Sequence, residues 1–308
     1  GVTPPAPVTA PVASPTPAPT TGTPPVATPA PVKPVNSGNN GSGNQNARSS
    51  LPELVSWSGC SLKYYRPQGQ PEIRTGADPL KPHQWHLKNL GSIEGKQFAR
   101  IKAGQDLNVE NAWNSGLNGD GIRVAVVDDG LDMTHPDLRP NIVDGSHNYR
   151  RQSLGENRYS SRIAGNKDWP VPCTEDDSHG TSVAGIIAAR DYNGIGGSGI
   201  APRASLVGYN ALANDLDSKL LDALVRDQGK NHIYNNSWGA EDDGHFNTPA
   251  SRSAQVGTIL NGLRNGRNGL GSIYTFAGGN GGANGDYSVL DGNVSMLGAI
   301  PVYGTNAA

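Results

Sequence analysis

The segment that decides the fold is Ile122-Arg-Val-Ala-Val-Val-Asp128-Asp129-Gly130. Its first six residues are apolar apart from one arginine, which predicts a buried strand. The Asp-Asp-Gly that follows ends this strand in a turn. Further strands are expected at Ala204–Tyr209, Ile233–Asn236 and Ser272–Ala277, and helices at Thr181–Arg190, Asp215–Asp227 and Ala254–Asn265. This alternation predicts an α/β fold with a mainly parallel central sheet, in which ligands bind at the carboxyl ends of the strands.

The sequence before this region has a different composition. Half of the 24 prolines lie between Pro4 and Pro34, and a tract rich in Gly, Asn and Ser runs from Asn36 to Asn46. Such sequence buries too little apolar surface to offset the entropy of ordering it. We therefore expect residues 1–50 to be a disordered tether and residues 51–308 to carry the folded domain. A proline-rich ligand for a partner module is the alternative interpretation of the tether.

Charge and hydrophobicity exclude several classes of partner. The net charge of −2 gives no basic excess that would attract nucleic acid or an anionic membrane surface. The apolar runs are far shorter than the roughly 18 residues that a membrane span needs, so we expect none. The two cysteines, Cys60 and Cys173, are predicted with equal weight to form a disulfide or to remain free thiols.

Three segments carry residues suited to catalysis. Asp128 follows the first strand, His179 precedes an apolar helix rich in small residues, and Asn280 follows a strand among glycines. Gly180 and Gly185 are expected to let the helix pack closely. Taken singly, each segment has a structural interpretation, namely a strand turn, a structural histidine and a glycine turn.

The order Asp, His, Asn resembles that of the subtilisin superfamily over about residues 75–308. The resemblance implies a subtilisin-like three-layer fold. It also implies that Asp128 orients the imidazole, that His179 is the general base, and that Asn280 stabilises the oxyanion. Residues 51–308 would then form the N-terminal portion of a peptidase domain.

Flanking residues resemble the kexin/furin branch of this superfamily. The matching segments are Ser237-Trp238-Gly239-Ala-Glu-Asp242-Asp243-Gly244, Asn280 to Asp291, and the stretch from Asp78 to Leu87 that contains Gln84-Trp85. The resemblance implies that Asp242 and Asp291 line the pocket for a basic P1 side chain, and that Asp129 and Asp176 face a basic P2 residue. Ser237, Trp238 and Gly239 would pair with the substrate backbone. The alternative is that these acids are solvated loop charges.

The same resemblance implies structural calcium, because residues of this chain match positions that supply hard oxygen ligands to Ca²⁺ in that family. A first site would use the side chains of Asp78, Asp137 and Asn193 and the carbonyls of Arg190, Ile195 and Gly197. A second site would use Asp242 and Asp286. A loop residue such as Asn193 is otherwise expected to serve only as a turn residue.

The serine motif of the superfamily, Gly-Thr-Ser-x-x-x-Pro, does not occur in the 308 residues. We therefore expect the serine to lie beyond residue 308, the C-terminal part of the fold to be missing, and the chain as given to be inactive. The predicted function is a serine endopeptidase that cleaves proteins or peptides after basic or dibasic residues. The alternative is a non-catalytic, protease-like module that binds basic peptides.

The chain also departs from the eukaryotic pattern. Ser182-Val183 stands where those members often have Arg-Cys, Cys60 and Cys173 match no convertase cysteine, and a proline-rich stretch precedes Asp78 in place of an inhibitory prodomain. These departures suggest a bacterial protein that is secreted, periplasmic or held at the cell surface. They also suggest that a separate chaperone or inhibitor assists its maturation.

Overall fold

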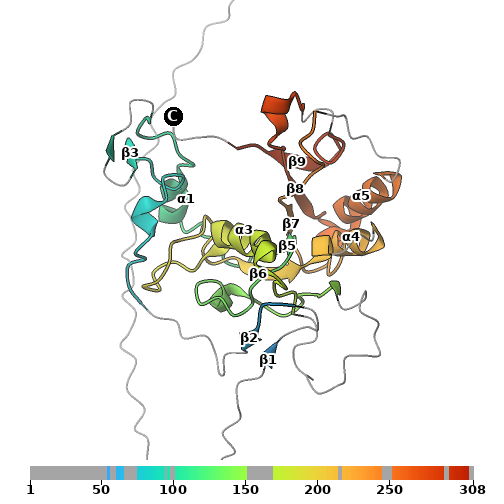
Figure 1. Cartoon of the computed structure of the whole chain (residues 1–308), viewed down its shortest axis with the longest axis horizontal. Helices are drawn as coiled ribbons and strands as arrows, with labels where there is room; N and C mark the ends of the chain where they lie inside the picture. Colours follow the sequence, from blue (N-terminus) through green and yellow to red (C-terminus); the bar gives the residue numbers. More distant parts are fainter. Residues whose placement is uncertain are drawn as a thin grey trace, which may run out of the picture. The chain divides into compact units, whose positions relative to one another are not determined.

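A computed structural model of the chain has a five-stranded parallel sheet at its centre (Figure 1). The structure describes residues 54–55, 60–65, 75–93, 96–97, 101–150, 169–213, 217–244, 252–287 and 291–304. The predicted tether, residues 1–50, lies outside these ranges.

The sheet has the strand order β6-β5-β7-β8-β9. Its strands are β5 (Arg123–Val127), β6 (Ser205–Tyr209), β7 (Ile233–Asn236), β8 (Ile273–Ala277) and β9 (Ala299–Val302). The pairs Val124↔Leu206 and Val124↔Ile233 set the register of β5 against its two neighbours. Because all strands run in one direction, the loops that follow them gather at one edge of the sheet.

Helices cover both faces of this sheet. The helix α3 (His179–Ala188) packs in one hydrophobic cluster with Val124 and Val126, and α4 (Asp217–Ala223) and α5 (Arg252–Gly269) pack in a second cluster with Ala125 and Val127. Alternate residues of a strand point to opposite faces, so β5 contributes to both clusters. The predicted three-layer α/β architecture is confirmed.

Smaller elements surround the sheet in the described parts of the chain. They are β1 (Leu54–Val55), β2 (Tyr64–Tyr65), β3 (Ser92–Ile93), β4 (Lys96–Gln97) and α1 (Val109–Asn114), with short 3₁₀ turns at Lys81–His83, Arg139–Asn141, Glu175–Ser178, Ala211–Ala213 and Gly281–Asn284. None of the described helices has the length and apolar character needed to cross a bilayer.

Two predictions of secondary structure need correction. The helix expected at Asp215–Asp227 ends at Ala223. Turns follow it, in which the N–H groups of Val225 and Gln228 bond to carbonyls three residues back and Asp227 has a left-handed φ of 53°. The expected start of the helix, residues 215–216, lies outside the described residues. The strand β9 was not predicted, since it is short and contains Pro301, which is tolerated at the edge that β9 occupies.

Candidate active site

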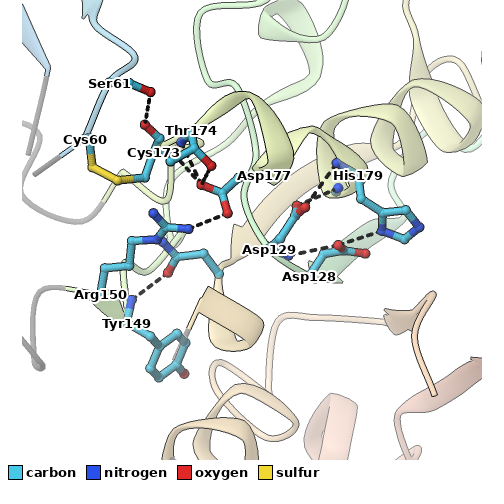
Figure 2. A network of polar contacts seen from close by, with 12 residues as sticks. Cys60, Ser61, Asp128, Asp129, Tyr149, Arg150, Cys173, Thr174, Asp177 and His179 are labelled. Carbon is cyan, nitrogen blue, oxygen red and sulfur yellow. Dashed lines mark hydrogen bonds and ion pairs between the residues drawn. A yellow bond between two sulfur atoms is a disulfide. The ribbon is translucent and has the colours of Figure 1, made fainter. Parts of the chain in front are cut away.

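Asp128 and His179 lie together at the carboxyl edge of the sheet. Asp128 directly follows β5, and its side chain is only 2% exposed, whereas the side chain of His179, the first residue of α3, is 54% exposed. The two side chains meet through His179 Nδ1 and Asp128 Oδ1, which are 2.8 Å apart (Figure 2). This contact occupies Nδ1 and leaves Nε2 as the ring nitrogen available for proton exchange.

The electrostatics of this pair follow from its burial. The hydrogen bond that His179 donates to Asp128 raises the pKa of His179 above its ordinary value, and partial burial only partly offsets this rise. Burial raises the pKa of Asp128, while the hydrogen bonds from His179 and from the Asp129 amide oppose that rise. A buried carboxylate beside an exposed imidazole stabilises the protonated ring, which is what a general base requires when it accepts a proton.

Asp129 contacts the backbone of the same histidine. One carboxylate oxygen accepts a hydrogen bond from the His179 amide at 3.1 Å, and the other accepts one from the Gly180 amide at 2.8 Å. Both amides belong to the first turn of α3, where N–H groups have no partner within the helix. The two adjacent aspartates therefore hold the ring and the backbone of His179 respectively.

Gly180 is required by the close contact between α3 and the turn after β5. A Cβ atom at Gly180 would lie 2.2 Å from the Gly130 carbonyl oxygen and 2.8 Å from Asp128 Cβ. The prediction of close packing is confirmed at Gly180 but is wrong at Gly185, where a Cβ would meet nothing within 4 Å.

The segment Ser237 to Gly239 follows β7 and crosses the end of β5. The indole nitrogen of Trp238 donates to the Val127 carbonyl at 2.9 Å, and its ring packs edge-on against Phe276. Ser237 Oγ accepts a hydrogen bond from the Asn235 amide group at 2.9 Å. These contacts fix the segment beside the candidate triad residues.

The two acids expected in the P1 pocket lie near two different glycines. The ideal Cβ position of Gly239 lies 3.8 Å from Asp291 Oδ2, and that of Gly279 lies 3.5 Å from Asp242 Oδ1. Asp242 also accepts a hydrogen bond from the backbone N–H of Asn280 at 3.0 Å. Within the described ranges, the Asn280 backbone N–H bonds to Asp242, and no hydrogen bond links Asn280 to His179.

Asp176, expected to face a P2 residue, is exposed in the turn that precedes His179. Asp129 is half-buried, and its two backbone contacts engage both of its oxygens. A carboxylate accepts about four hydrogen bonds, so Asp129 retains capacity for a substrate cation.

The residues expected to form the first calcium site meet in one loop cluster. Asp78, Asp137 and Asn193 are each 5% exposed or less. The Asn193 amide group donates to Asp137 Oδ1 at 2.7 Å, and Asp78 accepts the backbone N–H groups of Tyr192 and Asn193. The remaining members adjoin them: the amides of Arg190 and Gly197 bond to Asp137, and that of Ile195 bonds to Asn193.

These residues fit a hard divalent cation. Burial raises the pKa of Asp137, and the neighbouring charge of Asp78 raises it further. A buried pair of carboxylates beside the side-chain amide oxygen of Asn193 offers the hard oxygen donors that Ca²⁺ prefers. Within the described residues, no cluster of three or more His, Cys, Asp or Glu side chains is placed to hold a metal, so this donor set depends on oxygens of other types.

The second expected calcium site has one notable feature. Both carboxylate oxygens of Asp286 are buried and have no hydrogen-bond partner. A Cβ at Gly281 would lie 1.7 Å from Asp286 Oδ2, so the glycine is what admits this side chain. An unpartnered buried carboxylate is costly, and a cation shared with Asp242 would supply its missing partner.

Sequence reasoning missed several residues that support the site. Cys60 and Cys173 form a disulfide, although the sequence left their state open. Gln84 anchors its loop through two hydrogen bonds to the Ser198 backbone. Thr174 and Asp177 form a capping box before α3, which the Thr-x-x-Asp spacing could have indicated.

Comparison with known proteins identifies the family of the chain. The profile of the subtilase family (peptidase S8) matches residues 119–306, which is more than half of the chain. The chain is 39% identical to the dibasic-processing endoprotease of Schizosaccharomyces pombe over 72% of this chain and 28% of that protein. It is 35% identical to mouse furin over 71% of this chain and 25% of that protein.

A solved structure is also similar. The serine protease of Aeromonas sobria, crystallised as a complex with a chaperone, shares 34% identity and a TM-score of 0.52 over 70% of this chain and 35% of that one. The chain thus spans about a third or less of the length of these relatives. It belongs to the subtilase family, with relatives in its kexin and furin branch.

Proposed function

We propose that this chain is part of a serine endopeptidase in which Asp128 and His179 are two members of the catalytic triad. The observation that carries the proposal is the 2.8 Å contact between a buried carboxylate and an exposed imidazole. His179 Nε2 would accept the proton of the serine hydroxyl, and Asp128 would stabilise the resulting imidazolium. The side chain of Asn280 would donate a hydrogen bond to the oxyanion. The motif that carries the catalytic serine in this family, Gly-Thr-Ser-x-x-x-Pro, does not occur in the 308 residues.

The proposed substrates are proteins or peptides that carry basic residues before the scissile bond. Asp291 approaches Gly239, and Asp242 approaches Gly279 and accepts a hydrogen bond from the Asn280 backbone N–H, which supports a pocket for a cationic P1 side chain. A cation that leaves water must be paired with a carboxylate, and Arg forms strong bidentate pairs. Asp129, which bonds to the His179 backbone, and Asp176, which is exposed in the turn before it, would serve a basic P2 residue.

Structural calcium is part of the proposal. At the first site, Asp78, Asp137 and Asn193 would supply side-chain oxygens, and Arg190, Ile195 and Gly197 would supply carbonyls. At the second, Asp242 and Asp286 would contribute carboxylates. Calcium would neutralise the buried acids and fix the loops that carry them.

We further propose that the protein works in the secretory route or outside the cell. The Cys60–Cys173 disulfide supports this, because such bonds persist in oxidising compartments. One relative is named an extracellular serine protease, and the similar crystal structure contains a chaperone. A dedicated chaperone for maturation is therefore part of the hypothesis.

The test is to incubate the gene product that contains this chain with peptides that differ only at P1, and to map the products by mass spectrometry. We expect cleavage after Arg or Lys, fastest at dibasic pairs, and little cleavage after Phe. Equal cleavage after Phe would refute the acidic pocket. Tight binding of an Arg-Arg peptide without any hydrolysis would refute the enzyme and support a binding module.

A further inference from the structure

The turn that leads into His179 is tied to a distant part of the chain. The disulfide joins Cys173, in this turn, to Cys60, which lies 113 residues earlier (Figure 2). The amides of Ser61 and Leu62 both donate to the Cys173 carbonyl, at 3.0 and 3.1 Å. The covalent bond and the paired hydrogen bonds together fasten residues 60–62 to the turn.

This tying segment has a second anchor in the core. Tyr64 and Cys60 pack against the hydrophobic cluster that includes Leu131 and Val171. Burial raises the pKa of Tyr64 to about 12, with the charges of Asp132 and Asp177 adding to the effect. The phenol thus stays neutral in its apolar contact, and the segment is held at both ends.

Asp177 connects the disulfide to the histidine turn. Its Oδ2 accepts the backbone N–H groups of Cys173 and Thr174, at 2.9 and 2.8 Å, and the Thr174 hydroxyl at 3.2 Å. Its Oδ1 pairs with Arg150 at 2.6 Å, and both side chains are more than four-fifths buried. Burial raises the pKa of Asp177, but the hydrogen bond from Thr174 and the contact with Arg150 outweigh it, so the pKa is lowered overall.

We propose that the Cys60–Cys173 disulfide, acting through Asp177, is a positioning device for His179. Asp177 lies two residues before His179, so a shift of the Cys173 turn moves the start of α3 and with it the imidazole that faces Asp128. A dithiol reductant would supply two electrons and two protons, convert the bond to two thiols and release the turn. This inference rests on the proposed role of His179 as general base. It implies that thiols, by reducing the disulfide, shift the position of the His179 ring.

The test uses NMR of the gene product that contains this chain, with the His179 ring signal assigned by a His179→Ala variant. The chain is compared in its oxidised form, after treatment with dithiothreitol, and as the double variant Cys60→Ala/Cys173→Ala. Asp177→Asn, with the disulfide intact, provides a separate route to the same turn in case the cysteine variant does not fold. The control is a substitution of Ile259, which lies in the hydrophobic cluster on the other face of the sheet. Ile259→Val or Ile259→Ala is used, whichever lowers the melting temperature by the same amount as the cysteine variant does.

We expect reduction, the cysteine variant and Asp177→Asn each to lower the pKa of His179 toward its ordinary value, since its hydrogen bond to Asp128 weakens. Amide exchange over residues 174–182 should rise about tenfold or more. The Ile259 control should change neither. An unchanged His179 titration and unchanged exchange after reduction would overturn the inference.

Failure of this inference is distinguishable from failure of the proposed function. If the oxidised gene product cleaves basic peptides while reduction leaves the His179 titration unchanged, the positioning device is refuted and the protease stands. If it cleaves nothing, the protease is refuted, while the response of the His179 ring still reports whether the disulfide positions it.

Discussion

His179 Nδ1 lies 2.8 Å from Asp128 Oδ1, although the two residues are 51 positions apart in the chain. The carboxylate is 2% exposed and the imidazole 54% exposed. One partner is therefore fixed in the protein interior, while the other remains accessible to a substrate.

The first prediction concerns the titration of His179. Its pKa is raised chiefly by the hydrogen bond to Asp128, so the pair stabilises the fold fully below the ordinary pKa of about 6.5 and loses this contribution as pH rises through the folded pKa. The acid limb of kcat/KM should accordingly have its midpoint above about pH 6.5.

In Asp128→Asn, NMR should find the His179 pKa lower than in the wild type. His86, whose pKa burial lowers, is the internal control and should titrate identically in both proteins. A rise of the His179 pKa in the variant would contradict the assignment.

The second prediction compares two glycines of α3. Gly180→Ala should lower stability by about 1–3 kcal/mol through overpacking and kcat/KM by about 100-fold, because the helix start must move away from Asp128. Gly185→Ala meets open space in the same helix and should be neutral or stabilising by up to about 1 kcal/mol. Chemical denaturation and steady-state kinetics measure both effects. Equal behaviour of the two variants would show that the contact at Gly180 does not matter.

The third prediction concerns calcium. Saturation to about 100 times Kd should add about 2.7 kcal/mol to the free energy of unfolding, equivalent to a rise of about 5–10 °C in Tm for a domain of this size. Asp78→Asn should weaken binding and reduce this shift, as measured by calorimetry with and without a chelator. Asp144→Asn is the matched control, because Asp144 is exposed and outside the candidate sites. A chelator that leaves the wild-type Tm unchanged would argue against structural calcium.

The fourth prediction concerns substrate specificity. Asp291→Asn and Asp242→Asn should each lower kcat/KM for P1 Arg substrates by about 10- to 150-fold, the worth of one charge-assisted hydrogen bond. The rate for a P1 Phe substrate should change much less, because it has no charge to pair. Parallel assays on the two substrates separate these effects. A uniform loss on both substrates would assign the acids a structural role instead.

The sequence predicted the central sheet because its strands are buried apolar runs, and Ile233–Asn236 matches the observed β7 residue for residue. It also brought Asp128 and His179 into one candidate site, through the order of the Asp, His and Asn segments that resembles the subtilisin superfamily; taken singly, neither segment indicated catalysis. It did not predict β9, which contains Pro301 at a sheet edge, or the end of α4, which is followed by turns that include a left-handed φ at Asp227. The second role of Asp129, as a partner of two α3 amides, depends on side-chain direction and is not encoded in residue spacing.

The central claim is that His179 is the general base of a serine endopeptidase. The most direct measurement is kcat for an Arg-Arg substrate in the gene product that contains this chain, compared between the wild type and His179→Ala. We expect efficient turnover by the wild type and a loss on the order of 10⁶ in the variant, with the structure retained by circular dichroism. Undiminished turnover by His179→Ala, or a wild type that hydrolyses no peptide, would contradict the claim.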